Sequence, residues 1–530
     1  MDIIENEKKK RTILYGLLVT VLVLIGVTYA YYRITKTQTN SNVIGTRTCL
    51  NTTLTEETSE IVLSDAFPIS DEDGLKQSPF TFTLTNNCDS YVKVTIALVS
   101  EYRTSTNTAY LKDNYVKSNL LTKGTNDGSS VILSTLSLGE VDTNTQGYVL
   151  KTTGLKNKEA KSFDLRLWLD SETTNEQGLN KTWKGKIVVS VVAAEYVPTF
   201  AETILANNEV KAPITTPGAA ISTADEAEFA STEDDYGTSY YFRGAVTNNY
   251  VEFANKCWRI VRVGGDGSVK LILHNDNTAG VANPCDSANN SASAAFARYS
   301  ETTYTSAFNT NYNDNAYVGF KYGTVGASDY ATTHANTNNS TILTNLEAWY
   351  NNNLKTYESV IDDNVWCNDK TNVTDETYDP WNYTPNGLGY ANNVTFYGAT
   401  QRLVSSTSGS AGGTGLSLKC NGKLSKITSK IGLITADELA FAGYAAGTTA
   451  GTGNTTTYLQ ENATDTYWWS LSPGNFYGNS AHVWIVGGSS GVFGHRSVGN
   501  TSAVRPSISL KSTTNVTGNG TSSSPFIISM

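Results

Sequence analysis

The sequence is poor in positive charge, and this shortage excludes a class of function. Its 530 residues contain 39 Lys and Arg against 49 Asp and Glu, which gives a net charge of -10. Nucleic-acid phosphates require a basic surface, so we do not expect DNA or RNA as a partner. Only 17% of the residues are charged and 39% are hydrophobic. This composition excludes global disorder and is sufficient for two or three domains with cores.

Catalytic and metal-binding motifs are also missing. The four histidines are scattered along the chain at His274, His334, His482 and His495. No CxxC occurs, so the ligand spacing of a zinc site is absent, and there is no HExxH of a zinc protease. The acidic turns 71–74 and 233–235 lack EF-hand spacing. We therefore expect no metal, no cofactor and no enzymatic activity.

Strand- and turn-forming residues are abundant instead. The chain has 30 Tyr, 9 Trp and 43 Gly, with Thr, Asn and Ser between them. Aromatic and β-branched residues favour strands, while Gly and Asn favour turns. The composition is typical of a β-rich secreted or surface protein.

A membrane-spanning segment is predicted near the N-terminus. Residues 12–32 contain no charged side chain and follow four adjacent cations, Lys8 to Arg11. At about 1.5 Å per residue such a helix covers roughly 31 Å, close to the roughly 30 Å of bilayer hydrocarbon. The cations favour a cytoplasmic tail, 1–11, and place the rest of the chain outside the cell.

A cleavable signal peptide is the alternative to a permanent anchor. The small residues Thr28 and Ala30 fit a signal-peptidase site, and cleavage after Ala30 would give a secreted protein. An uncleaved anchor would give a single-pass cell-membrane protein with extracellular C-terminal domains. No LPxTG-like motif is found at the C-terminal end, so covalent attachment to a cell wall through that end is not expected.

The six cysteines fit an oxidising exterior. The candidates for disulfides are Cys49, Cys88, Cys257, Cys285, Cys367 and Cys420. Two lie before residue 100 and four after residue 250, which allows pairing within each group, with Cys49–Cys88 the preferred pair. Reduced, buried thiols remain the alternative.

An all-β sandwich is predicted for residues 33–196. Apolar residues occupy every second position in 80–84 and again in 92–98, with turn-forming residues between them. This pattern predicts a hairpin with one buried face. Similar strands are expected at 163–169 and 183–192. No helical period interrupts the alternation, which favours an antiparallel sandwich.

The next segment, 197–230, is rich in Pro, Ala and Thr and is predicted to be a linker with one short helix, 201–208. A second, α+β domain is predicted for 231–530. It opens with a β-meander between residues 240 and 273. Ser340 is suited to cap one helix, and Thr435 to Glu438 match a capping box ahead of another.

Two resemblances support this division. The sequence Gly-Val-Thr-Tyr-Ala-Tyr-Tyr at 26–32, followed by a β domain, resembles the camelysin/TasA-type exported proteins of Gram-positive bacteria. That resemblance implies a β-sandwich, surface exposure and, in some members, fibre assembly. The sequence Trp-Trp-Ser-Leu-Ser-Pro-Gly at 468–474, with Val-Arg-Pro at 504–506, resembles an uncharacterised family of bacterial surface domains. This second resemblance implies a C-type-lectin-like fold for the second domain and brings no established ligand.

A ligand surface is predicted among the aromatic residues of this second motif. Strict alternation along 481–486 places His482 and Trp484 on one face of a strand. Exposed aromatic rings beside hydrogen-bonding groups suit flat sugar or peptide surfaces. The predicted ligand-binding residues are Trp484, His482, Tyr477 and Arg496, and the predicted structural residues are Trp468, Trp469 and Arg505. The alternative is that all these tryptophans fill the core.

These features predict a bacterial cell-surface display or adhesion protein. The N-terminal helix would make the membrane its first partner, and the distal domain would bind an extracellular glycan or protein. The alternative function is a structural or fibre-forming component of the extracellular matrix.

Overall fold

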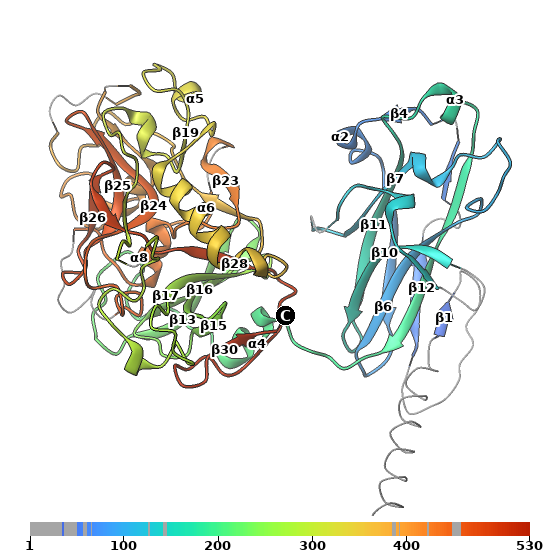
Figure 1. Ribbon diagram of the computed structural model, residues 1–530, viewed down its shortest axis with the longest axis horizontal. Helices are drawn as coiled ribbons and strands as arrows, with labels where there is room; N and C mark the ends of the chain where they lie inside the picture. Colours follow the sequence, from blue (N-terminus) through green and yellow to red (C-terminus); the bar gives the residue numbers. More distant parts are fainter. Residues whose placement is uncertain are drawn as a thin grey trace, which may run out of the picture. The chain divides into compact units, whose positions relative to one another are not determined.

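The protein consists of two compact units that divide between Val197 and Pro198. The computed structural model describes residues 34–36, 50–56, 61–64, 66–125, 128–140, 146–300, 302–383, 388–391, 393–420, 423–447 and 457–529. We call the part before the division unit 1 and the part after it unit 2. Strands predominate in both units (Figure 1).

Unit 1 is built from two six-stranded sheets. The first contains β1 (Ile34–Lys36), β3 (Ile61–Leu63), β6 (Val92–Ser100), β9 (Leu138–Glu140), β10 (Gln146–Leu155) and β12 (Trp183–Ala193). The second contains β2 (Thr52–Glu56), β4 (Pro68–Ile69), β5 (Phe80–Asn86), β7 (Val116–Thr122), β8 (Val131–Ile132) and β11 (Ala160–Asp170). Short helical turns connect them: α2 (Asp71–Gly74), α3 (Asn175–Gly178), η1 (Asp113–Tyr115) and η2 (Leu133–Thr135).

The two sheets share one hydrophobic core. Ile96 of β6 and Val189 of β12 come from the first sheet, and Leu84 of β5 and Phe163 of β11 come from the second. Residues at alternate positions of a strand point to the same face, so each sheet presents one apolar face to the other. Unit 1 is therefore a β-sandwich, as the alternation predicts.

The predicted hairpin in unit 1 is wrong, although both of its strands exist. β5 pairs with β2 and β11, whereas β6 pairs with β12 and β10. The turn between them crosses from one sheet to the other. A strand with one buried face is compatible with either arrangement, because alternation identifies the buried face and not the neighbouring strand.

The predicted membrane span, 12–32, lies outside the described residues, as do the tail 1–11 and Cys49. No helix in the described ranges combines the length and the hydropathy that crossing a bilayer requires.

Unit 2 contains an eight-stranded and a six-stranded sheet. The larger contains β13 (Ala227–Asp234), β14 (Gly237–Gly244), β15 (Tyr250–Phe253), β16 (Lys256–Val263), β17 (Val269–Asn275), β28 (Ser507–Leu510), β29 (Val516–Thr517) and β30 (Phe526–Ile528). The smaller contains β18 (Thr305–Ala307), β22 (Thr395–Phe396), β24 (Trp468–Tyr477), β25 (Ser480–Val486), β26 (Phe493–Ser497) and β27 (Thr501–Ala503). Two ribbons pair β19 (Lys321–Tyr322) with β20 (Asn338–Asn339), and β21 (Asn364–Cys367) with β23 (Lys426–Ser429).

The helices of unit 2 are α4 (Phe200–Asn207), α5 (Tyr330–Thr333), α6 (Thr341–Asn353), α7 (Gly398–Leu403) and α8 (Ala436–Ala442), with 3-10 turns η3 (Ser287–Asn289), η4 (Asn315–Val318), η5 (Lys355–Tyr357) and η6 (Lys423–Ser425). Two of them, α6 and α8, begin at the caps that the sequence predicts. The side chain of Ser340 accepts from the backbone N–H of Leu343, and Thr435 forms a capping box with Glu438. Gly443 ends α8 with φ 124°, a conformation that favours glycine.

The segment predicted as a linker, 197–230, is instead largely part of unit 2. Phe200 and Ile204 of α4 are buried in the core of unit 2, and the Phe200 ring packs edge-on against Phe526 of β30. Thr199 also bridges to Asn515. The beginning and the end of unit 2 therefore lie side by side (Figure 1).

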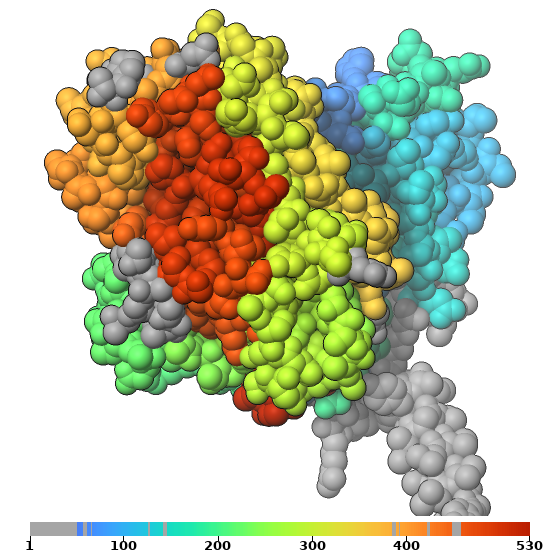
Figure 2. All heavy atoms as spheres, turned by 60° about the vertical axis from the view of Figure 1, so that its left-hand side comes forward, coloured from blue at the N-terminus to red at the C-terminus, as the bar shows by residue number. Residues whose placement is uncertain are grey.

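Segments far apart in the sequence form a common surface on unit 2. Figure 2 shows a face on which the C-terminal segment, in red, runs between yellow-green and orange segments from the middle of the chain. Parts of the sequence that no local pattern connects are thus neighbours in space.

Candidate functional site

Two disulfides lie in unit 2. Cys257 is bonded to Cys285, and Cys367 to Cys420. The predicted pairing within the second group of four cysteines is therefore confirmed. Cys88 is also disulfide-bonded, and its predicted partner, Cys49, lies outside the described residues.

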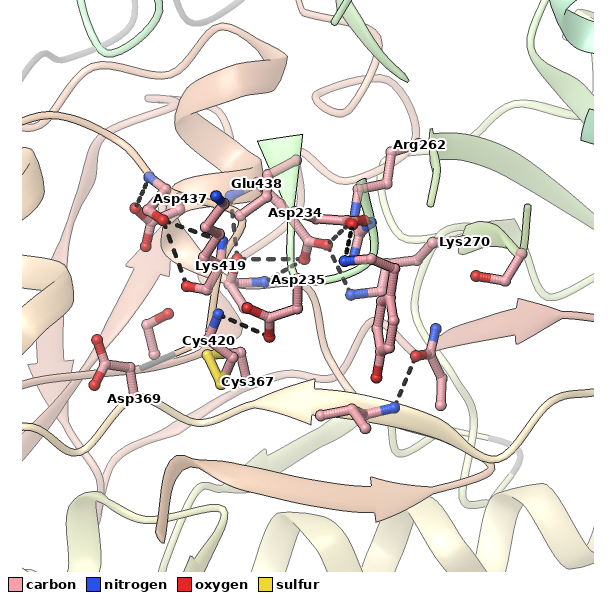
Figure 3. A pocket seen from close by; sticks show the side chains of 18 of the residues that line it. Asp234, Asp235, Arg262, Lys270, Cys367, Asp369, Lys419, Cys420, Asp437 and Glu438 are labelled. Carbon is pink, nitrogen blue, oxygen red and sulfur yellow. Dashed lines mark hydrogen bonds and ion pairs between the residues drawn. A yellow bond between two sulfur atoms is a disulfide. The ribbon is translucent and has the colours of Figure 1, made fainter. Parts of the chain in front are cut away.

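A charged pocket in unit 2 is bordered by the second of these disulfides (Figure 3). Its walls come from the ends of β13 and β16, from β17, from the N-terminal turn of α8, and from the segment 417–420 that the disulfide ties to β21. Six carboxylates and four cations line it: Asp234, Asp235, Asp266, Asp369, Asp437 and Glu438, with Arg262, Lys270, Arg402 and Lys419. The cavity is small, about 40 Å³.

Glu438 is the centre of the first ion cluster in the pocket. Its Oε1 accepts from Lys270 Nζ at 2.7 Å and from Arg262 Nε at 2.9 Å, and its Oε2 accepts from the backbone N–H of Thr435. Burial would raise the pKa of Glu438, but Lys270 and Arg262 outweigh it and hold that pKa at about 2. The carboxylate therefore stays ionised although it is buried.

Arg402 is the centre of the second cluster. Its Nε and Nη2 donate to the two carboxylate oxygens of Asp437, both at 2.8 Å, and its Nη1 donates to Asp369 at 2.6 Å. Two parallel hydrogen bonds of this kind fix both partners in one geometry. The backbone N–H of Ser417 also donates to Asp437, so the same cluster positions the outer wall.

The mouth of the pocket differs from its base, because its charges are not all paired. Asp266 is exposed and accepts only from Ser268, and neither Asp266 nor Lys419 has an ion-pair partner in the described part of the chain. Tyr236 is 52% exposed. Burial raises the pKa of Tyr236, and the charges of Asp266 and Asp235 raise it further. An aromatic ring beside carboxylates therefore faces the opening.

Some residues of this pocket belong to patterns that are visible in the sequence, but the sequence does not predict that these patterns meet in space. The acidic turn 233–235 and the capping box 435–438 are visible as separate local patterns. Their meeting depends on Arg262, which donates to both Asp234 and Glu438. No spacing rule predicts a contact between residues that far apart.

Replacing Glu438 by Gln is expected to lower the free energy of unfolding by about 3–5 kcal/mol, because Lys270 is then buried without its carboxylate. Glutamine can still accept from Thr435, so the loss reports the charge rather than the helix cap. Chemical denaturation near neutral pH measures it. The carboxylate of Glu438 stabilises the fold above its ordinary pKa and loses this effect as the pH falls toward 2, and the variant should lack that dependence. Glu358→Gln, at an exposed ion pair, is the control, with a cost of about 1 kcal/mol or less.

The predicted exposure of Trp484 is wrong, because the side chain is 1% exposed. Its Nε1 donates to the Thr400 hydroxyl of α7 at 3.1 Å, and its ring packs 4.8 Å from that of Phe493. On the other face of β25, Val483 and Ile485 are buried as well. The strand lies between β24 and β26 and is covered on both sides, so alternation has no solvent face to identify.

The other three predicted ligand residues do not form one surface. His482 lies on the same face as Trp484. Arg496 pairs with Val483, which places it on the opposite face, where its guanidinium lies 4.7 Å from the Tyr467 ring. Tyr477, at the end of β24, is stacked 3.6 Å from Tyr383. The predicted surface of four residues is therefore divided between two sides of the sheet.

The residues predicted to be structural lie in the core of unit 2. Trp468 and Trp469 have no exposed surface, and Trp469 Nε1 donates to the carbonyl of Ser306. Arg505 is 1% exposed, donates to the carbonyl of Leu273 and lies 5.0 Å from the Trp468 ring.

Trp484→Ala is expected to lower the free energy of unfolding by about 3–5 kcal/mol, the cost of removing a large buried aromatic side chain. Thermal and urea unfolding of the full chain measure the loss. Tyr312→Ala is the control, because Tyr312 is 49% exposed. A Trp484→Ala variant as stable as the control would contradict the burial of this side chain.

No group of three or more His, Cys, Asp or Glu side chains in the described ranges is arranged to hold a metal ion. The acidic turn 71–74 forms α2, where carboxylates pair with Lys76 and Lys117. No protein-family model matches the chain, and the search of curated proteins finds no similar sequence. Function is therefore inferred from the chemistry of the pocket.

Proposed function

We propose that the protein is displayed on the bacterial surface, anchored by residues 12–32, and that unit 2 binds an extracellular partner. The disulfides of unit 2 support an oxidising environment. The Trp-Trp motif at 468–474 supports a C-type-lectin-like fold for unit 2, and the leader at 26–32 supports a camelysin/TasA-type origin for the anchor and unit 1.

The observation that carries this function is the mouth of the charged pocket. The lining has two more carboxylates than cations. Asp235 pairs with Lys426 outside the lining, whereas Asp266 has no ion-pair partner in the described ranges. Tyr236 exposes its ring beside these two carboxylates. A positive group is attracted both to carboxylates and to the face of an aromatic ring. The cavity of about 40 Å³ is large enough for an ammonium group and too small for a sugar ring. The ligand we propose is an amino group, presented as a lysine side chain of a partner protein.

The arrangement favours binding over catalysis. Glu438, Asp437 and Asp369 at the base are each held by a cation, and Arg402 holds two of them. A general base or nucleophile needs a free lone pair within reach of substrate, whereas these groups are already engaged. Their rigidity instead preorganises the mouth for a ligand, which lowers the entropic cost of binding.

The proposal can be tested with an array of extracellular proteins and glycans probed with the full chain in detergent. We expect protein binders, and we expect acetylation of their lysines to abolish the signal. Asp266→Asn and Tyr236→Ala should each weaken binding by about tenfold, since each removes one attraction of about 1–2 kcal/mol. Glu358→Gln, which removes an exposed carboxylate elsewhere on unit 2, should have no effect.

Binding that survives both lysine acetylation and the two pocket variants would contradict the amine site. A silent array together with ordered self-assembly of the full chain would replace the adhesion function by the fibre-forming one.

A further inference from the structure

A second cavity in unit 2, of about 260 Å³, has a different chemistry. It lies between the segment that follows β18, the β19–β20 ribbon and the first turn of α6. Two tyrosines form its aromatic part: the rings of Tyr317 and Tyr322 lie 5.4 Å apart and are tilted by 60°. The remaining lining consists of four asparagines and three threonines. None of the nine lining residues is charged.

The lining offers hydrogen-bonding groups that the described part of the chain does not use. Asn339 and Asn345 each donate through Nδ2, to Glu347 and to Ser306. No donor to their Oδ1 atoms is found among the described residues. Within the same ranges, neither the Asn311 amide nor the hydroxyls of Tyr317 and Tyr322 have a hydrogen-bond partner. The pocket thus presents donors and acceptors together.

One lining residue fixes the shape of the pocket instead. The Nδ2 of Asn309 donates to the carbonyl of Tyr317, and its Oδ1 accepts from the backbone N–H of Thr341. Asn309 is buried and therefore ties the tyrosine wall to the start of α6. The cavity is preformed, and a ligand does not need to order it.

We propose that this pocket binds one ring of a neutral carbohydrate. Sugar hydroxyls both donate and accept, so they match amide and hydroxyl groups better than charged ones, and the apolar face of a pyranose suits an aromatic wall. The volume is slightly below the roughly 300–1,000 Å³ of small-molecule sites, which fits one sugar ring and not an extended peptide. The proposal goes beyond the amine site, because the two pockets share no residue.

The place of the pocket within unit 2 leaves it accessible to a sugar that is carried by another molecule. β19 lies at the end of unit 2 away from α4 and β30, where the chain enters and ends (Figure 1). Within unit 2 the sugar pocket is therefore remote from the point at which the chain enters.

The test is titration calorimetry of the full chain in detergent with methyl glucoside, methyl galactoside, methyl mannoside and N-acetylglucosamine. N-acetylneuraminic acid serves as the anionic probe and a neutral tetrapeptide as the other ligand class. We expect at least one neutral sugar to bind and the anionic sugar and the peptide not to bind. Tyr322→Ala should weaken sugar binding by about tenfold, and Asn311→Ala by about fivefold.

Asn311 is exposed and makes no hydrogen bond with the described residues, so the Asn311→Ala variant does not disturb folding. Tyr312→Ala is the control, because it removes an exposed ring that lies outside the lining. Absence of neutral-sugar binding, or binding unchanged by both pocket variants, would overturn the proposal. Asp266→Asn should leave sugar binding intact, so failure here and failure of the amine site are separate results.

Discussion

A fragment of residues 231–530 is expected not to fold, whereas one that begins at Pro198 is expected to fold. The shorter fragment lacks Phe200, Ile204 and Phe229, which are buried in the core of unit 2. Each large apolar side chain that is removed costs about 3–5 kcal/mol. It also lacks Glu226, which holds Arg243 in an ion pair with no exposed surface on either side, and breaking such a pair costs about 3–5 kcal/mol more. Together these losses match or exceed the roughly 5–15 kcal/mol that stabilise a whole domain.

Circular dichroism and thermal unfolding of the two fragments would measure this difference. A fragment of residues 209–530 is the informative intermediate, because it lacks α4 but keeps the Glu226–Arg243 pair. We expect it to fold but to unfold at a lower temperature than the fragment that begins at Pro198. Equal unfolding temperatures for 198–530 and 231–530 would show that the segment 198–230 contributes nothing to unit 2.

Acidification is expected to unfold unit 2 before unit 1. All four histidines lie in unit 2. Burial lowers the pKa of His482 to about 4 and those of His334 and His495 to about 3, and it lowers that of His274 as well. Nearby charges add to this effect at three of them, through Lys370 at His334, His482 at His495, and Arg259 at His274.

The direction in which stability changes with pH follows from proton binding. Below about pH 6.5 the unfolded chain protonates its histidines, whereas in the folded chain His334, His482 and His495 stay neutral until the pH reaches about 3–4. Stability is therefore complete above 6.5 and falls as the pH decreases through this interval. At about pH 4.5 each of these three histidines lowers the free energy of unfolding by about 2–3 kcal/mol. Buried carboxyls with a raised pKa, such as Asp276, act in the opposite direction and reduce the loss.

Thermal unfolding between about pH 7.5 and 4.5 tests this. Unit 1 has no histidine and is the internal control, so its transition should move less. His495→Phe should reduce the slope of unit 2 stability against pH, whatever it does to stability at neutral pH. A unit 2 transition that stays constant over this range would contradict the prediction.

Several long strands of both units could be predicted from local patterns, and their neighbours could not. β11 and β12 follow from apolar alternation, and α8 from its capping box and Gly443. The partner of β5 depends on which sheet it joins, and that is decided by the packing of the whole sandwich. Likewise, the helix at 200–207 is recognisable, but its burial against Phe526 depends on the end of the chain.

The candidate sites likewise depend on contacts that local sequence patterns do not predict. Alternation predicts a solvent face for Trp484 because it assumes that one side of a strand is open, whereas α7 covers that side through Thr400. The charged pocket depends on Arg262 joining Asp234 to Glu438, a long-range contact. The sugar pocket is formed within residues 309–345, but Asn and Thr in a sequence indicate turns before they indicate a cavity.

The contact between α4 and β30 has a mechanical consequence. If the chain is anchored through unit 1 while unit 2 holds its partner, a pulling force is applied to unit 2 at Pro198 and acts on α4 first. This helix of eight residues is held through Phe200 and Ile204, with Phe200 against Phe526. The helix belongs to no sheet, so its detachment would break the bridge between Thr199 and Asn515 but no strand ladder. Its release would lengthen the tether under load before either pocket is disturbed.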